Sequence, residues 1–356
     1  MDLYPLRFEP VYKEKIWGGT KLKEVFNRKL PNNKIGESWE VTAHPNGTSI
    51  VSNGDFKGKK ITSLIEEYPE EMLGSKVKYD VKRRFPLLVK FLDANDKLSV
   101  QVHPDDDYAQ RVEGEPGKTE MWYIIDAKVG TKLIYGLKPG TTRDEFARAI
   151  RNGTLERYLN EVEVKRGDIL FIPAGTIHAI GEGILLAEIQ QNSDITYRVY
   201  DWNRPGKDGK PRPLHIDKAL DIINFNQETI KAKSKPLIFK GDSYTRYFLA
   251  ACPYFVTEKL DIRGSYSLSP TGERFYVIIA LDGEGRLLHR SSSYKLAPGT
   301  TFFLPAALDR VTIEGQSEFL VTYIPAGKRE IINRLAKLGF SEKNTMELAG
   351  ITHWEF

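Results

Sequence analysis

Two histidines, a glutamate and a glutamine are spaced so that they could converge on one metal ion. Residues 98–104 alternate between polar and apolar, which places Gln101 and His103 on the same face of a predicted strand. Glu120 opens the next apolar stretch, and His178 ends a Pro-Ala-Gly turn. Imidazoles, a carboxylate and an amide oxygen, with no thiolate, are typical of a catalytic metal site that keeps one position open.

An internal repeat places these residues in only one of two related segments. Residues 166–174 resemble residues 298–306, and residues 120–125 resemble residues 273–278. The second copy has no Gln-x-His pair and no histidine after its turn, so any chemistry is expected in the first copy. Its own glutamate, Glu273, is expected to be a structural carboxylate.

Each feature also has an ordinary structural interpretation. A Gln-x-His pair on a strand is usually an ordinary part of the polar surface, and a histidine after a turn usually makes only a structural hydrogen bond. Their coincidence in one repeat copy is what favours a metal site. The other histidines have no partner at ligand spacing and are expected to be structural or at the surface: His44, His215, His289 and His353.

The elements that must position these side chains are mostly short strands. Strands are expected at residues 37–41, 87–92, 132–135 and 168–172, each bounded by Gly, Pro, Asn or Asp. Short strands at close spacing suggest a sandwich or barrel, and the repeat suggests two diverged β-barrels.

Helices are expected to interrupt the strands at four places. Capping-box spacing at Ser63 and at Thr142, each followed three residues later by glutamate, predicts two helix starts. A third helix is expected around residues 219–223. A fourth is expected over residues 328–338, with Gly339 as its stop.

Length, charge and cysteine content exclude several classes of protein. The 356 residues allow two domains, and the 40% hydrophobic and 28% charged residues are ordinary for a globular chain. A net charge of +4, with basic runs only at 57–60 and 82–84, argues against nucleic acid as a partner. A single cysteine, Cys252, indicates a reducing compartment, and the cytoplasm is expected. No signal peptide and no membrane-spanning stretch is found.

Taken together, the motifs resemble those of the type I mannose-6-phosphate isomerase family, in its short bacterial form, within the cupin superfamily. The resemblance covers about residues 5–325. It rests on Gln101-x-His103, Lys118-Thr119-Glu120, the Pro-Ala-Gly-Thr-x-His turn ending at His178, Glu188 with Arg198 ten residues on, Trp17-Gly18-Gly19 and Trp39-Glu40-Val41. Short-form members usually end near the second barrel, so the segment from Gly327 to Phe356 departs from the pattern.

The resemblance implies a zinc-dependent isomerase that interconverts mannose 6-phosphate and fructose 6-phosphate, through a cis-enediol intermediate. One zinc ion per subunit is implied, together with an essential arginine at Arg198. The residues that match the zinc ligands are Gln101, His103, Glu120 and His178. Glu188 is the leading candidate for the base, and a hydroxide on the zinc is the competing one. Arg198 and Lys118 are the candidates for gripping the phosphate or stabilising charge, and Trp17 and Trp202 could wall the pocket.

The expected fold is mainly β, with two cupin jelly-roll barrels, helical inserts and a short C-terminal helical extension. The expected division is a catalytic domain over residues 1–240, a degenerate barrel without metal ligands over 241–326 and the extension over 327–356. The expected partner is a small sugar phosphate, and the chain is expected to be a monomer or a homodimer. Two rival functions stay open: a cupin isomerase or oxygenase that uses iron or manganese, and a sugar-phosphate sensor without turnover.

Overall fold

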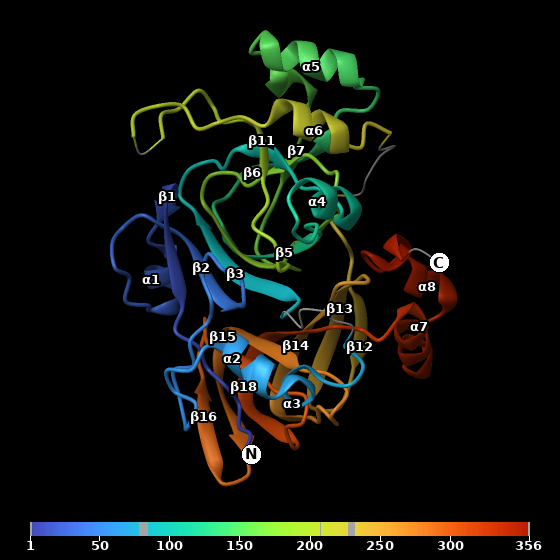
Figure 1. Cartoon of the computed structure of the whole chain (residues 1–356). Helices are drawn as coiled ribbons and strands as arrows, with labels where there is room; N and C mark the ends of the chain where they lie inside the picture. Colours follow the sequence, from blue (N-terminus) through green and yellow to red (C-terminus); the bar gives the residue numbers. More distant parts are fainter. Residues whose placement is uncertain (1, 78–84, 207, 227–231, 355–356) are drawn as a thin grey trace.

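Two β-rich bodies lie one above the other in the computed structural model of the chain (Figure 1). The structure describes residues 2–77, 85–206, 208–226 and 232–354. The basic run at residues 82–84 therefore lies outside the described residues.

The upper body consists of two antiparallel sheets that carry the candidate site. The first has the order β1-β2-β3-β10-β5-β8 and is made of β1 (Val11–Gly19), β2 (Ile35–Thr42), β3 (Leu87–Ala94), β5 (Glu120–Ala127), β8 (Ile169–Ile172) and β10 (Ile184–Gln191). The second has the order β11-β4-β9-β6-β7 and is made of β4 (Val100–Val102), β6 (Lys132–Leu137), β7 (Leu159–Glu163), β9 (His178–Ala179) and β11 (Tyr197–Tyr200).

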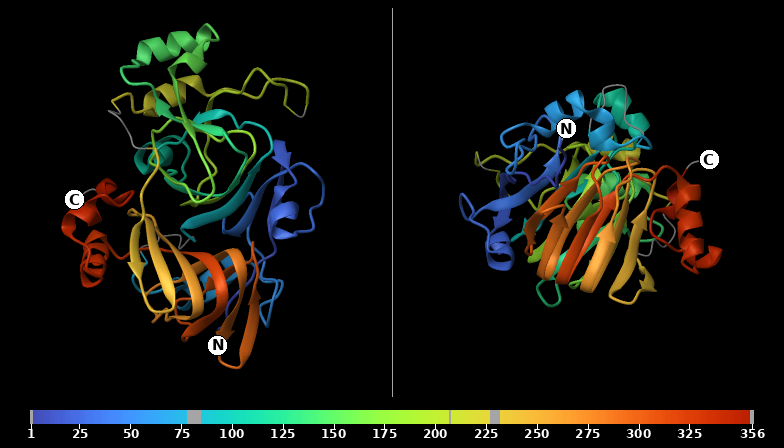
Figure 2. Two further views of the ribbon diagram at one scale, coloured as in Figure 1. Left: turned by 180° about the vertical axis from the view of Figure 1, so that it is seen from behind. Right: turned by 90° about the horizontal axis from the view of Figure 1, so that it is seen from below.

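The lower body is one antiparallel sheet with the order β12-β13-β14-β18-β15-β16, in which β17 pairs with β15. Figure 2 shows this sheet from behind and from below. Its strands are β12 (Leu237–Lys240), β13 (Tyr244–Ala251), β14 (Val256–Leu268), β15 (Tyr276–His289), β16 (Ser292–Leu296), β17 (Thr301–Leu304) and β18 (Val311–Tyr323).

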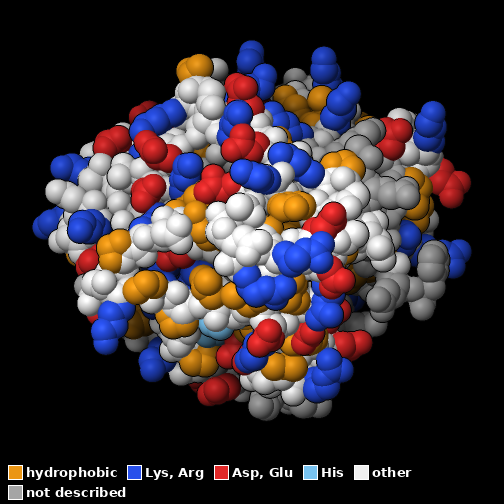
Figure 3. Space-filling model, turned by 90° about the horizontal axis from the view of Figure 1, so that it is seen from above, with side chains coloured by type: hydrophobic (Ala, Val, Ile, Leu, Met, Phe, Trp, Pro, Cys, Tyr) orange, Lys and Arg blue, Asp and Glu red, His pale blue; other side chains and the backbone are white. Residues whose placement is uncertain are grey.

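The helices lie outside the sheets. They are α1 (Lys21–Phe26), α2 (Ile61–Glu67), α3 (Pro69–Leu73), α4 (Asp106–Val112), α5 (Arg143–Arg151), α6 (Ile216–Ile222), α7 (Lys328–Lys337) and α8 (Glu342–Met346), with the 3₁₀ helices η1 (Leu155–Tyr158) and η2 (Ile351–His353). Helices α5 and α6 cover the top of the upper body, where basic and acidic side chains are mixed over the surface (Figure 3). Among the described helices, none has the length and apolar character needed to span a membrane.

All four predicted strands are present, as β2, β3, β6 and β8, and the mainly β fold is confirmed. The capping box at Thr142 is also present, at the start of α5. The helix start predicted at Ser63 is wrong, because α2 begins two residues earlier and has no side-chain cap. Its buried residues Ile61, Leu64 and Ile65 show that packing, rather than capping, sets this helix start.

The internal repeat corresponds to one structural unit present in both bodies. Strands β8 and β17 begin and end at equivalent positions of the two copies, and they pair antiparallel with β5 and β15 respectively. Helix α5 has no counterpart between β15 and β17. One copy therefore carries a helical insert that the other lacks.

The two bodies share one hydrophobic core. Phe85 of the first part of the chain lies between Phe275 and Phe303 of the second, with ring centroids 5.1 and 5.9 Å away. The first residues of the chain also join the lower body, because Leu6 exchanges two backbone hydrogen bonds with Phe303, at 2.9 and 2.8 Å. The proposed boundaries at 240/241 and 326/327 stay a prediction, and these contacts cross the first of them.

Candidate active site

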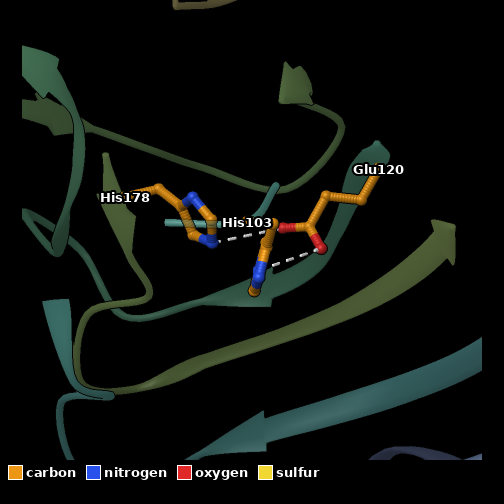
Figure 4. Close-up of side chains that lie close together, drawn as sticks. All are labelled: His103, Glu120 and His178. Atoms are coloured by element: carbon orange, nitrogen blue, oxygen red, sulfur yellow. Dashed lines mark ion pairs between the residues drawn. The ribbon is translucent and has the colours of Figure 1, made fainter. Parts of the chain in front are cut away.

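The four predicted metal ligands come from both sheets of the upper body, at or next to strands β4 and β9 of one sheet and β5 of the other. Gln101 lies in the middle of β4, and His103 follows the end of that strand. His178 opens the two-residue strand β9 and faces Gln101 directly across the β4–β9 pair. Glu120 is the first residue of β5 and points toward both histidines (Figure 4).

Three of these side chains form a buried cluster. One ligand atom from each of His103, Glu120 and His178 lies within 4.8 Å of the others, and all three residues are buried. The Nε2 atoms of His103 and His178 lie 3.7 and 3.4 Å from the two carboxylate oxygens of Glu120. Among the described residues, this is the only group of this kind.

Backbone carbonyls orient both imidazoles. The Nδ1 atom of His103 lies 2.8 Å from the carbonyl oxygen of Ile195, and Nδ1 of His178 lies 2.9 Å from that of Thr176. Since a carbonyl can only accept, each Nδ1 carries the hydrogen and each Nε2 keeps a lone pair that faces the cluster. This is the tautomer that a metal-binding histidine needs.

Burial keeps both imidazoles uncharged. It lowers the pKa of His178 to about 4, and the ammonium of Lys118 acts in the same direction. Burial, Lys118 and the second imidazole also lower the pKa of His103 well below its usual value. At neutral pH the two lone pairs are therefore available.

The donor set fits a divalent cation. Oε1 of Glu120 is buried, has no hydrogen-bond partner among the described residues and faces the lone pair of His178 Nε2 at 3.4 Å. Two acceptors at this distance repel each other unless positive charge lies between them. The ammonium of Lys118 supplies one positive charge next to the cluster, since its Nζ lies 2.9 Å from His103 Nε2 and 2.5 Å from Glu120 Oε2.

Gln101 lies beside the cluster through its amide. Its Nε2 is 3.3 Å from Nε2 of His178. Because the two ends of an amide differ only by a flip of the group, the same side chain can present its oxygen to a cation in that position. All four predicted ligands are thus neighbours, while three of them form the compact cluster.

Glu188 belongs to an alternating row of buried charges that ends at the cluster. Its Oε1 lies 2.8 Å from Lys90 Nζ and 3.9 Å from Lys118 Nζ, and its Oε2 accepts a hydrogen bond from Trp122 Nε1 at 2.9 Å. Burial by itself raises the pKa of Glu188, but Lys90 and Lys118 outweigh it and the pKa is lowered. Glu188 is therefore a buried carboxylate that is ionised at neutral pH, as a base must be.

Glu37 continues this row on strand β2. Its carboxylate is 2.8 Å from Lys15 Nζ and accepts a hydrogen bond from Trp39 Nε1 at 2.7 Å. Burial opposes ionisation, yet Lys15 and Lys90 lower the pKa of Glu37 to about 2.

Arg198 lies on β11, in register with Gln101 on β4. Its Nη1 donates to the carbonyl of Pro213 at 3.0 Å, and its buried Nε has no hydrogen-bond partner among the described residues. Burial and the nearby guanidinium of Arg212 lower the pKa of Arg198. Within the described part of the chain no carboxylate pairs with Arg198, and such a cation beside the cluster is suited to an anionic substrate.

A cavity lies beside the cluster, and Gln101 and Lys118 line it, whereas His103, Glu120 and His178 do not. It is lined by Lys15, Trp17, Glu37, Lys90, Leu92, Leu98, Ser99, Gln101, Lys118, Ile180, Glu188, Asp194, Thr196, Arg198 and Arg212. Trp17 thus belongs to the cavity wall. Trp202 does not; it lines a separate neighbouring cavity, and its Nε1 donates to the carbonyl of Leu98 at 2.7 Å. The backbone of Trp202 takes a left-handed conformation with φ of 56°.

The remaining predicted residues lie outside the cluster. Glu273 forms surface ion pairs with Lys76 and Arg274. His215 precedes α6 without a capping hydrogen bond from its side chain, and its Nδ1 accepts the backbone N–H of Arg198 on β11 at 3.1 Å.

Sequence reasoning missed Lys90, Glu37 and Arg212 as cavity residues. A signal was present for Lys90, because a lone lysine inside the apolar stretch Leu87–Leu92 must be buried and therefore paired. No comparable pattern marks Arg212, which reaches the cavity from a loop.

Known proteins that resemble this chain agree with this geometry. The family model of the type I phosphomannose isomerase catalytic domain matches residues 5–126, and that of the mannose-6-phosphate isomerase cupin domain matches residues 244–324. The chain is 41% identical over 321 residues to the probable mannose-6-phosphate isomerase GmuF of Bacillus subtilis. The aligned residues cover 90% of this chain and 99% of that relative.

The chain belongs to the type I mannose-6-phosphate isomerase family. The predicted resemblance is thereby confirmed, and so is the expectation that the chain is an enzyme of this family. The mannose-6-phosphate isomerase of Streptococcus mutans is 38% identical over 319 residues, covering 90% of this chain and 98% of that relative.

The fold comparison agrees with the family. The crystal structure of the mannose 6-phosphate isomerase from Bacillus subtilis matches with a TM-score of 0.84 at 38% identity, covering 90% of this chain and 100% of that one. The expected cupin architecture is confirmed by this match and by the cupin-domain model.

Proposed function

We propose that the protein is a zinc-dependent aldose–ketose isomerase that interconverts mannose 6-phosphate and fructose 6-phosphate. The observation that carries the proposal is the buried group His103, Glu120 and His178 in a chain of this family. Its acceptor atoms converge beside an ionised glutamate and an arginine that has no carboxylate partner among the described residues. A zinc ion held by these three residues and Gln101 would supply the positive charge that polarises the sugar's carbonyl and adjacent hydroxyl.

Isomerisation moves one hydrogen between C1 and C2 of the open-chain sugar. The carboxylate of Glu188 removes the proton from C2 of the aldose, and the electron pair moves through the C1 carbonyl onto O1 to form a cis-enediolate. The proton of the C2 hydroxyl passes to O1, so that the negative charge comes to lie on O2 of the cis-enediol. The same carboxyl group then returns the proton to C1 as the ketone forms at C2, so the enzyme ends as it began.

The surrounding cations balance the charge during this transfer. Lys90 and Lys118 keep Glu188 ionised before the transfer, and Lys118 lies within 3.9 Å of it. The guanidinium of Arg198 would stabilise the oxygen on which negative charge grows, since its donors are not engaged by a carboxylate. Trp17, Leu92 and Leu98 supply the apolar part of the wall.

The proposal is tested with the purified protein, its metal content and a product assay. We expect mannose 6-phosphate to give fructose 6-phosphate, the activity to disappear after chelation, and stoichiometric zinc to restore it. Glu188→Gln should lower kcat roughly 10²- to 10⁴-fold while the zinc content stays unchanged.

Other outcomes point to the rivals. Tight binding of mannose 6-phosphate without product would support a sensor. Recovery of activity with iron or manganese but not zinc, or consumption of oxygen, would support the other cupin chemistries. The cytoplasmic location and the choice between monomer and homodimer stay predictions.

A further inference from the structure

A second arginine enters the cavity from a loop, and another side chain fixes its direction. Arg212 lines the cavity together with Arg198. Its Nε and Nη2 each donate to the carboxylate of Asp201 at 2.6 Å, which uses one edge of the guanidinium fork. Its Nη1 forms no hydrogen bond to any other described residue, and so it is free to meet a ligand.

Asp201 is itself held firmly. It is 6% exposed, and Arg204 donates to it at 3.1 and 3.2 Å while also reaching Asp96 at 2.8 Å. The loop that joins Arg204 to Arg212 is closed by a β-bridge between Pro205 and Pro211. Because the carboxylate is fixed before any ligand arrives, the guanidinium of Arg212 is oriented in advance.

Arg198 and Arg212 lie at different distances from the predicted metal ligands. Arg198 is in register with Gln101, next to the cluster. Strand β11 then runs away from His103, and Asp201 follows its last residue, Tyr200. Three residues of extended chain place the backbone of Asp201 roughly 10 Å from that of Arg198, which is the scale that separates C1 from the phosphate in an open-chain hexose 6-phosphate.

The ion pairs at the far end leave Arg212 facing the cavity. The guanidinium groups of Arg204 and Arg212 are paired there with the carboxylates of Asp96 and Asp201. Of these two arginines, Arg212 lines the cavity. Guanidinium groups suit phosphate oxygens because their donors match them in pairs.

We propose that Arg212, positioned by Asp201, anchors the phosphate group of the substrate and determines the preference for phosphorylated sugars, while Arg198 serves the reacting end. This inference rests on the proposed function and deepens it. Asp201 is a positioning residue, since it contacts Arg212 and not the substrate.

The test separates binding from turnover. In Arg212→Met the KM for mannose 6-phosphate should rise about 10- to 100-fold, as expected for the loss of charge-assisted hydrogen bonds, with kcat close to that of the wild type. Inorganic phosphate should inhibit the wild type competitively, and its inhibition constant should rise in parallel in the variant. Asp201→Asn should shift both constants in the same direction by less.

Two comparison variants make the result specific. Lys210→Met removes a positive charge from the same loop without touching the cavity and should change neither constant. Arg198→Met should lower kcat while the inhibition constant of phosphate stays near the wild-type value. Thermal unfolding of every variant checks that the fold is retained.

Specific results would overturn the proposal. If Arg212→Met lowers kcat and leaves the inhibition constant of phosphate unchanged, Arg212 acts at the reacting end. If the wild type turns out not to isomerise the sugar, calorimetric binding of mannose 6-phosphate replaces the kinetics. Equal affinity of wild type and Arg212→Met would then overturn the anchor independently of the proposed function.

Discussion

At the scale of single residues, the site depends on burial to set protonation. The two imidazoles are neutral because burial makes their charged forms costly, whereas Glu188 is ionised because two lysines oppose that cost. The same buried environment therefore holds two neutral imidazoles beside one ionised carboxylate.

Replacement of His178 by alanine should remove the metal and the activity together. The variant loses one of the three buried ligand atoms and leaves Glu120 Oε1 without its neighbour. We expect a fall in zinc per chain, measured by elemental analysis, and a matching fall in kcat.

His353→Ala is the matched control, since His353 lies outside the cluster. Its zinc content should equal that of the wild type. Full zinc and full activity in His178→Ala would contradict the ligand assignment.

The candidate ligands could be predicted from sequence because their types are specific and they belong to one repeat copy. Arg212 could not be predicted, because its position depends on Asp201 and on closure of the loop at Pro205 and Pro211. Such contacts are tertiary and leave no local pattern. Trp202, which could have walled the same pocket as Trp17, lines the adjacent cavity and donates to the carbonyl of Leu98, which is likewise a tertiary contact.

At the scale of elements, the C-terminal extension connects the two bodies. Helix α7 places Arg334 3.0 Å from the fully buried carboxylate of Glu258 on β14. Farther on, Ala349 pairs with Ala250, and the ring of His353 lies 5.2 Å from that of Phe171 on β8 of the upper body. The extension thus contacts both barrels. It lies after residue 324, where the match to the cupin-domain model ends.

Arg334→Met should lower the free energy of unfolding by about 1–3 kcal/mol, because a buried carboxylate loses one of its charged donors. Arg246 remains at 2.5 Å from Glu258, so the carboxylate keeps one ion pair. Urea unfolding measures the change.

Lys337→Met, on the exposed side of α7, is the control and should have no measurable effect. A stability loss equal in both variants would show that the ion pair with Glu258 contributes nothing.

The helix α7 was predictable from its apolar spacing and its glycine stop, and the structure has it within one residue. The short elements α8 and η2 were not predicted, because a helix of three to five residues depends on what it packs against. Gly350 illustrates this: its φ is 81°, and a side chain there would lie 2.8 Å from the carbonyl oxygen of Ala251.

At the scale of the whole molecule, the shared core makes the two barrels one unit. Aromatic rings of both parts interlock, as between Phe85 and Phe275 at 5.1 Å and between Phe171 and Phe255 at 6.3 Å. The repeat in the sequence indicates two barrels, but it does not show that they share a core, since the contacts join residues far apart in the chain.

The protein should therefore unfold in a single cooperative transition. Calorimetry should give a van't Hoff enthalpy equal to the calorimetric enthalpy for the whole chain. Addition of zinc should move this one transition to a higher temperature, because the metal binds only the folded state. Two separate transitions, of which only one responds to zinc, would show that the barrels are independent.

The pairing of Leu6 with Phe303 has a consequence for how the protein is made in the cell. Arg7 and Phe8 can pair early, with Ser52 and Val51, but the strand partner of Leu6 is made only when nearly all of the chain has been synthesised. At roughly 5–20 residues per second, that interval is on the order of 15–60 s. Until then the buried position of Leu6 is incomplete, which makes this part of the segment a natural target for chaperones that act on nascent chains.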